Sequence, residues 1–181
     1  VLAFPIKEGS EYPSFPVRGR LRLSEDAADF FKDEDAGVSA SNRLRGIVLH
    51  DILSQVSNAS DLKKAVDYAQ MTGNLTADEA RTAFGLLTEA LKSVEDRGWF
   101  ADDVQLTYNE ASLIDTDGEI YRPDRVTVCG GKVVIVDYKF GEHQKKYEKQ
   151  VRKYMDMWRR MGYEDVSGFL RYVDALSVIE V

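Results

Sequence analysis

The chain has 181 residues, of which 44% are hydrophobic, and it carries a formal net charge of -7. This length and apolar content suit one globular domain with a full-sized core, and no apolar run approaches the length that spans a bilayer. The only cysteine, Cys129, excludes an internal disulfide framework and any four-cysteine cluster. We therefore expect a cytoplasmic protein that does not associate with a membrane. Because residue 1 is not methionine, we also expect it to be part of a larger protein.

The net negative charge argues against general nucleic-acid binding, because contacts to phosphates need cations. The charge is, however, unevenly distributed along the chain. From Lys139 to Arg160 there are eight lysines and arginines and only three acidic residues, whereas residues 25–35 have six acidic residues and one lysine. Binding of a polyanion would therefore depend on the local cationic segment.

Residues 1–40 are predicted to form an extended segment or linker, since three of the four prolines of the chain lie there. Within it, residues 17–23 alternate apolar side chains with arginines, which indicates a strand with one basic face. The simpler interpretation is an edge strand protected by charge, and the alternative is a contact to a DNA backbone. The three arginines are Arg18, Arg20 and Arg22.

Three helices are predicted over residues 41–56, 60–71 and 76–97, and together they would form an N-terminal helical layer. Ser60 is a candidate cap for the second helix. The sequence Thr76-Ala-Asp-Glu79 is a capping box for the third helix, and Gly98 is expected to end it.

After these helices the hydrophobic pattern changes to that of strands, predicted over residues 104–114, 119–128 and 132–139, with tight turns at Asp117-Gly118 and Gly130-Gly131. A helix over 144–161 and strands over 166–173 and 176–181 follow. This order predicts an α/β fold, with a central mixed sheet flanked by helices and a crossover through the helix 144–161.

Two aspartates and a lysine stand at the ends of predicted buried strands. Asp137 and Lys139 share one face of their strand, and Asp124 falls roughly opposite Asp137 on the antiparallel neighbour. Two nearby carboxylates repel each other, and a divalent cation such as Mg²⁺ or Mn²⁺ removes that repulsion. Such a site suits phosphodiester hydrolysis, and a simple ion pair between Asp137 and Lys139 is the alternative.

Other polar residues would be ordinary if taken singly. His50 lies on the polar side of its helix, and Gly46, one turn earlier, is expected to leave space beside the imidazole. Glu110 lies in the first predicted strand, and Gln150 and Tyr154 are four residues apart on the helix 144–161. For each of these residues taken alone, a structural role is the simpler interpretation.

Taken in order, these residues resemble a known family. The segments Gly46-Ile-Val-Leu-His50, Asn109-Glu110, Pro123-Asp-Arg125, Val136-Asp-Tyr-Lys139 and Gln150-Val-Arg-Lys-Tyr154 are similar to the nuclease domain of RecB/AddA-type helicase–nucleases, a branch of the PD-(D/E)XK nucleases. The resemblance covers about Arg43 to Tyr154, and it implies a restriction-endonuclease-like core in a nuclease domain over residues 41–181.

Carried over residue by residue, the resemblance implies a metal site and a catalytic lysine. Metal ligands would be His50, Asp124, Asp137 and the backbone carbonyl of Tyr138, with Lys139 catalytic and Glu110 supporting. The family's Asp-Tyr-Lys is often followed by threonine, whereas this chain has Phe140, which should face away from Asp137. Some relatives hold an iron–sulfur cluster on four cysteines, and the single cysteine excludes one here.

The resemblance also implies partners and a reaction. Gln150 and Tyr154 would position the scissile DNA strand. Independently of the resemblance, the cationic surface of the helix 144–161 suggests that Lys149, Arg152 and Lys153 bind that strand. The expected enzyme is a Mg²⁺- or Mn²⁺-dependent exodeoxyribonuclease that acts in DNA end processing and recombinational repair. It would be joined to helicase domains of the same parent chain and to a partner subunit. Two alternatives remain, a non-catalytic DNA-end-binding domain of the same fold and an enzyme acting on another phosphate ester.

Overall fold

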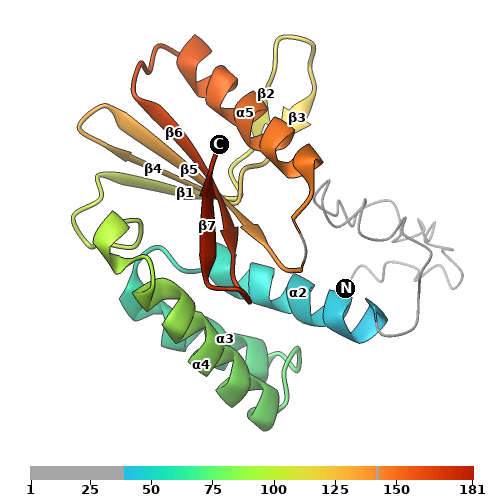
Figure 1. The fold of residues 1–181 in the computed structure, drawn as a ribbon. Helices are drawn as coiled ribbons and strands as arrows, with labels where there is room; N and C mark the ends of the chain where they lie inside the picture. The colour runs from blue at the N-terminus through green and yellow to red at the C-terminus, as the bar shows by residue number, and fades with distance from the viewer. Residues whose placement is uncertain (1–38, 142) are drawn as a thin grey trace, which may run out of the picture. The chain divides into compact units, whose positions relative to one another are not determined.

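The computed structural model describes residues 39–141 and 143–181, and these form a five-stranded sheet with helices on both faces (Figure 1). The strand order is β1-β4-β5-β6-β7, in which β5 and β6 are parallel and the other neighbouring pairs are antiparallel. A separate two-stranded sheet is made by β2 and β3. The predicted α/β fold with a mixed central sheet is thus confirmed. The arginine-bearing strand 17–23 and nearly all of the expected linker 1–40 lie outside the described residues.

The helices and strands follow the predicted order. The helices are α2 (Ser39–Ser54), α3 (Leu62–Met71), α4 (Ala77–Lys92) and α5 (Lys145–Arg160), with short 3₁₀ turns η2 (Ala59–Asp61) and η3 (Glu95–Arg97). The strands are β1 (Leu106–Asn109), β2 (Leu113–Ile114), β3 (Ile120–Tyr121), β4 (Arg125–Cys129), β5 (Lys132–Lys139), β6 (Val166–Tyr172) and β7 (Ser177–Glu180). Within the described part of the chain, no helix is both long and apolar enough to cross a membrane.

The helical layer of α2, α3 and α4 differs from the prediction at two ends. The Thr76 capping box of α4 is present as predicted, but α4 stops at Lys92 because Val94 leaves the helical conformation. The segment that was predicted to continue it is the 3₁₀ turn η3, and Gly98 (φ 67°) ends that turn instead. Ser60 is not the cap of the second helix either, because the Asn58 carboxamide accepts a hydrogen bond from the Ser60 amide and begins η2.

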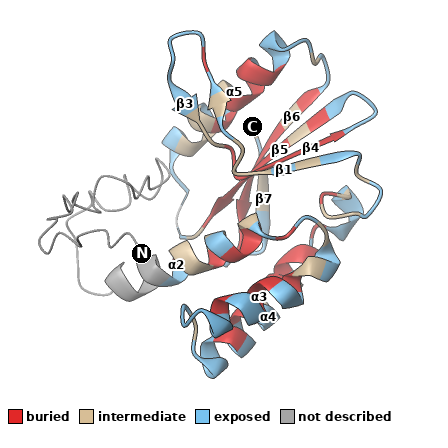
Figure 2. Cartoon of the chain, turned by 180° about the vertical axis from the view of Figure 1, so that it is seen from behind, coloured by how far each residue is buried: buried red, intermediate tan, exposed pale blue. Residues whose placement is uncertain are grey.

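The two faces of the sheet bury separate groups of apolar side chains, which appear as red segments in Figure 2. Along β5, Val133 and Ile135 pack under α5, against Val151 and Tyr154. Val136 and Tyr138, which alternate with them, pack against α2, α3 and α4. Asp137 and Lys139 therefore share the α5 face, whereas the neighbouring Phe140 packs against the helical layer, as its position predicted.

The predicted strands 104–114 and 119–128 form one hairpin with an interruption. Asn109 pairs with Arg125 and Leu113 with Tyr121, so the register is the same on both sides of the break. Between them, Pro123 has no amide hydrogen to donate, and Glu110 adopts a left-handed conformation (φ 49°). The hairpin bends there, so that β1 and β4 join the main sheet while β2 and β3 leave it. The prediction of two continuous strands was wrong at this point.

Candidate active site

The bend of the hairpin brings Glu110 and Asp124 face to face. The Glu110 amide donates a 3.0 Å hydrogen bond to the Asp124 carbonyl, which continues the hairpin register through the break. Residues directly opposite in an antiparallel pair project to the same side. Two acidic side chains, from the end of β1 and the start of β4, are therefore directed to one place.

His50 of α2 lies between these two carboxylates. Its Nδ1 is 3.1 Å from Glu110 Oε1, and its Nε2 is 2.9 Å from Asp124 Oδ2. The same Asp124 oxygen accepts a 2.6 Å hydrogen bond from the amide of Tyr138. His50 of α2 thus contacts the end of β1 through Glu110, and it contacts the start of β4 through Asp124, whose buried carboxylate also holds the β5 backbone.

The charges of this cluster are strongly coupled. Burial acts to lower the pKa of His50, but the charge of Asp124 and the hydrogen bonds with Asp124 and Glu110 outweigh it, and the pKa is raised well above its usual value of 6.5. The hydrogen bond from His50 in turn lowers the pKa of Glu110. This arrangement thus favours the charged forms of both the imidazole and the Glu110 carboxylate.

Asp137 and Lys139 form a buried pair next to this cluster. Lys139 Nζ lies 2.7 Å from Asp137 Oδ2, with side-chain exposures of 7% and 1%. The ammonium also lies over the ring of Tyr147, 4.5 Å from its centroid. Because Arg125 pairs with Val136, the next pair in the register is Asp124 with Asp137, as the sequence predicted. Asp137 and Lys139 are therefore directed to the same side of the sheet as Asp124.

Gly46, which was expected to leave space beside His50, has the Phe140 side chain as its neighbour, and the space beside the imidazole stays a prediction. A Cβ placed there would meet the side chain of Phe140 at 3.8 Å, which is ordinary van der Waals contact. Gly46 faces Phe140, the residue after Lys139, because α2 packs across the end of β5.

The donor atoms of the cluster fit a hard divalent cation. Carboxylate oxygens are the preferred ligands of Mg²⁺ and Mn²⁺, and an imidazole suits Mn²⁺. In residues 39–141 and 143–181, no three histidine, cysteine, aspartate or glutamate side chains are arranged as metal ligands. Both His50 nitrogens instead contact carboxylates directly.

The predicted DNA-binding residues of α5 differ in their surroundings. The Gln150 amide donates a 2.8 Å hydrogen bond to the Tyr154 hydroxyl, and Tyr154 itself is only 1% exposed. Arg152 pairs with Glu148 at 3.2 Å, and Lys153 pairs with Asp115 at 2.5 Å, whereas Lys149 is exposed. Of the three basic residues, Lys149 is therefore the most available for a phosphate.

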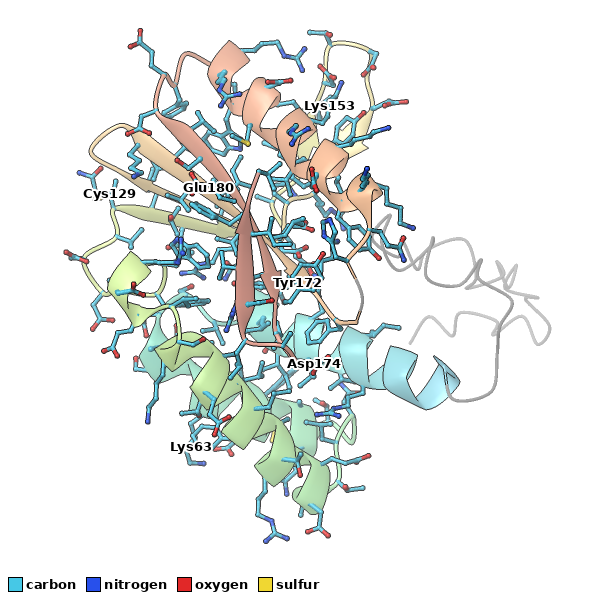
Figure 3. The ribbon with its side chains drawn as sticks, in the orientation of Figure 1. Lys63, Cys129, Lys153, Tyr172, Asp174 and Glu180 are labelled. Atoms are coloured by element: carbon cyan, nitrogen blue, oxygen red, sulfur yellow. The ribbon has the colours of Figure 1, made fainter. Side chains whose placement is uncertain are left out.

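Asp115, which sequence reasoning did not single out, fixes the small sheet to α5. Its buried carboxylate lies 2.5 Å from Lys153 Nζ and 2.8 Å from Arg160 Nη1. Hydrogen bonds from Arg160 and then Lys153 hold the pKa of Asp115 well below its usual value. Figure 3 shows Lys153 on the side of α5 that faces this hairpin. The only signal in the sequence was an acidic residue before the turn Asp117-Gly118, which is typical of any exposed turn.

The α/β fold with its mixed five-stranded sheet is that of a class of nucleases. The family model of the PD-(D/E)XK nuclease superfamily matches residues 17–177 of the chain. The chain belongs to this superfamily, and it is a nuclease domain whose reaction class is hydrolysis. The search of the curated proteins finds no match. The site roles carried over by the resemblance stay predictions.

Proposed function

We propose that this chain is a metal-dependent DNA nuclease domain that hydrolyses phosphodiester bonds. The observation that carries the proposal is the bend of the hairpin, where His50 contacts both Glu110 and Asp124 next to the buried pair of Asp137 and Lys139. In a member of the PD-(D/E)XK superfamily, this concentration of acidic side chains beside one lysine is the arrangement that the reaction needs.

The resemblance assigns each of these groups a role. His50 in its neutral form, Asp124, Asp137 and the carbonyl of Tyr138 would hold Mg²⁺ or Mn²⁺, with Glu110 in support, so that binding of the cation would displace the proton shared by His50 and the carboxylates. When bound, such an ion stabilises charge on the phosphate and lowers the pKa of a bound water. Lys139, held against Asp137, would orient the attacking water by hydrogen bonding and would stabilise negative charge that develops on the phosphate.

We also propose that the DNA lies along the exposed side of α5. Gln150 would contact the scissile strand, and Tyr154, being buried, would act by holding the Gln150 amide. Lys149 would contribute most of the phosphate affinity, because Arg152 and Lys153 have acidic partners in the protein. The acidic chain should bind DNA weakly by itself, which agrees with a domain that receives DNA from helicase domains and a partner subunit.

The resemblance to RecB/AddA-type enzymes favours an exodeoxyribonuclease in DNA end processing and recombinational repair, located in the cytoplasm. Labelled linear and circular DNA distinguish the modes of cleavage, because an exonuclease degrades only linear DNA. The assay is run with Mg²⁺, with Mn²⁺ and with chelator. Metal-dependent loss of linear DNA alone is the expected result, whereas DNA binding without cleavage would support the non-catalytic alternative.

A matched pair of variants tests the chemistry. Lys139→Ala should abolish cleavage while DNA affinity is retained, because the ammonium acts on the reacting groups. Lys132→Ala, at the exposed opposite end of the same strand β5, should cleave as the wild type does. Equal cleavage by both variants would remove Lys139 from the mechanism.

A further inference from the structure

Three residues beside Lys139 form a hydrogen-bonded chain that the proposed function does not use. His143, in the segment between β5 and α5, has its Nδ1 2.8 Å from the Tyr172 hydroxyl and its Nε2 3.1 Å from Glu148 Oε1. Arg152 extends the chain with a 3.2 Å hydrogen bond to the other oxygen of Glu148. Glu148 comes from α5 and Tyr172 from the end of β6, where it is labelled in Figure 3.

The directions of these hydrogen bonds follow from the chemistry of the groups. An ionised carboxylate can only accept, so His143 Nε2 donates to Glu148. In the neutral imidazole the other nitrogen must then accept, and the Tyr172 hydroxyl donates to Nδ1. Each link therefore fixes the orientation of the next, from the helix to the phenol of Tyr172.

Tyr172 is the direct neighbour of Lys139 in the sheet. The two residues are paired in the parallel register of β5 and β6, and the amide of Val173 donates a 3.0 Å hydrogen bond to the Lys139 carbonyl. Paired residues of adjacent strands project to the same face, so the phenol lies beside the lysine side chain. Burial and then the neighbouring Tyr147 raise the pKa of the Tyr172 phenol, while the charge of Lys139 acts to lower it.

Lys139 is thus enclosed by Asp137, the Tyr147 ring and Tyr172, and it is 6% exposed. A lysine side chain has four rotatable bonds, and a catalytic ammonium must be held in one place. Asp137 fixes the charge at one end, but the lateral position of the side chain depends on its neighbours. The orientation of Tyr172 is set by its hydrogen bond with His143, and Glu148 of α5 holds His143 in turn.

We propose that Glu148, His143 and Tyr172 position Lys139 for catalysis, an inference that rests on the proposed nuclease function. All three are positioning residues, since Tyr172 acts through Lys139, and His143 and Glu148 act through Tyr172. The chain also ties the segment that follows the lysine to α5, the helix along which the DNA is proposed to lie.

The test removes one hydrogen-bonding group of the chain at a time and leaves the apolar core packed. Tyr172→Phe keeps the ring and deletes only the hydroxyl, and His143→Ala breaks the middle of the chain. Each should lower kcat for linear DNA about tenfold with little change in KM, because the chemistry loses its orientation while DNA binding does not. The double variant should be no slower than either single variant, since both act through one chain.

Two controls separate positioning from a structural effect. Tyr163→Phe removes the hydroxyl of a partly buried tyrosine that packs on Trp158 beyond the other end of α5, and it should leave kcat unchanged. Glu148→Gln keeps an acceptor oxygen and should retain more activity than Glu148→Ala. A wild-type kcat for Tyr172→Phe, or additive losses in the double variant, would overturn the proposal.

A measurement without substrate separates this proposal from the proposed function. The side-chain ¹⁵N resonance of Lys139, assigned by its loss in Lys139→Ala, should shift in Tyr172→Phe and in His143→Ala but not in Tyr163→Phe. If the wild type cleaves no DNA while these shifts are seen, the nuclease assignment fails and the link from the chain to the lysine stands. An unchanged resonance in both variants would overturn the link itself.

Discussion

Replacing Arg125 with methionine should destabilise the protein by about 3–6 kcal/mol, by removing the donors that join the sheet to the helical layer. Arg125 is fully buried, and its guanidinium donates five hydrogen bonds. Four go to backbone carbonyls, and the fifth goes to the side-chain oxygen of Asn109. The carbonyls are those of Val56 (2.7 Å), Ser57 (2.6 Å) and Trp99 (3.1 and 2.7 Å).

The magnitude follows from what the substitution leaves behind. A buried acceptor that loses its donor costs about 1–3 kcal/mol, and this applies to the carbonyls of the buried Val56 and Trp99 and to the part-buried side-chain oxygen of Asn109. The Ser57 carbonyl belongs to an exposed residue, so water can replace part of its loss. The Val56 carbonyl keeps a 3.1 Å hydrogen bond from the Asn109 side chain, so its cost is smaller. Removing the buried charge of Arg125 recovers some desolvation free energy. The unpaired acceptors cost more than this, so the net effect is destabilising. Against a typical stability of about 5–15 kcal/mol, the loss is a large fraction of the total.

Urea unfolding followed by circular dichroism measures the difference. Arg125→Met should lower the midpoint strongly at an unchanged slope, and Arg125→Lys should fall between it and the wild type, because an ammonium can donate to some of these carbonyls. The control is Arg122→Met, in which the lost arginine donates to the Ser112 hydroxyl at an exposed position. If Arg125→Met and Arg122→Met unfold at the same urea concentration, the buried hydrogen bonds do not stabilise the protein as argued.

Three further outcomes are expected. Gly168→Ala should destabilise the protein by about 1–3 kcal/mol in urea unfolding, because a Cβ there would lie 2.5 Å from the Val151 side chain of α5. The control is Gly85→Ala, since no atom of the described residues lies within 4 Å of the new Cβ. Asp115→Asn should flatten the dependence of stability on pH below about pH 4. The pKa of Asp115 is lower in the folded than in the unfolded protein, so its carboxylate stabilises the fold above the unfolded-state pKa, and this contribution is lost as the pH falls. An unchanged slope of stability against pH contradicts this. DNA titrations at several salt concentrations compare Lys149→Ala with the variant in which Lys149, Arg152 and Lys153 are all alanine. The single change should cause most of the loss of affinity and of salt dependence that the triple change causes, because Arg152 and Lys153 already pair with acidic residues. Equal losses from each single change would contradict this.

Much of the fold could be predicted because the hydrophobic pattern is local. The continuous apolar run of β5 and the apolar stripe of α5 are readable within one segment, and the parallel pairing of β5 with β6 follows from the helix between them. The break in the hairpin could not be predicted this way. The register continues unchanged through it, so the apolar pattern gives no sign that Glu110 leaves the strand conformation.

The contacts around the site escaped prediction for a different reason. Asp115 meets Lys153 and Arg160 only after the small sheet folds back on α5, and nothing in the local sequence specifies that approach. The same holds for His143, whose hydrogen bond to Tyr172 needs β6 to lie beside β5. The family-like residues could be proposed as site residues because a known arrangement guided the reading, and these additional pairs had no such guide.

The position of Asp124 connects stability to the proposed chemistry. Adjacent strand residues project to opposite faces, so Arg125 enters the helical layer while Asp124 faces His50 and the side of Asp137. The five hydrogen bonds of Arg125 fix the backbone at the start of β4, where the ladder has already been interrupted by Pro123. The bend directs the Asp124 side chain to His50, and the hydrogen bonds of Arg125 hold the adjacent backbone in place. We therefore expect Arg125→Lys to lower kcat at temperatures well below its unfolding transition, because a small displacement at Asp124 is enough to disturb the site.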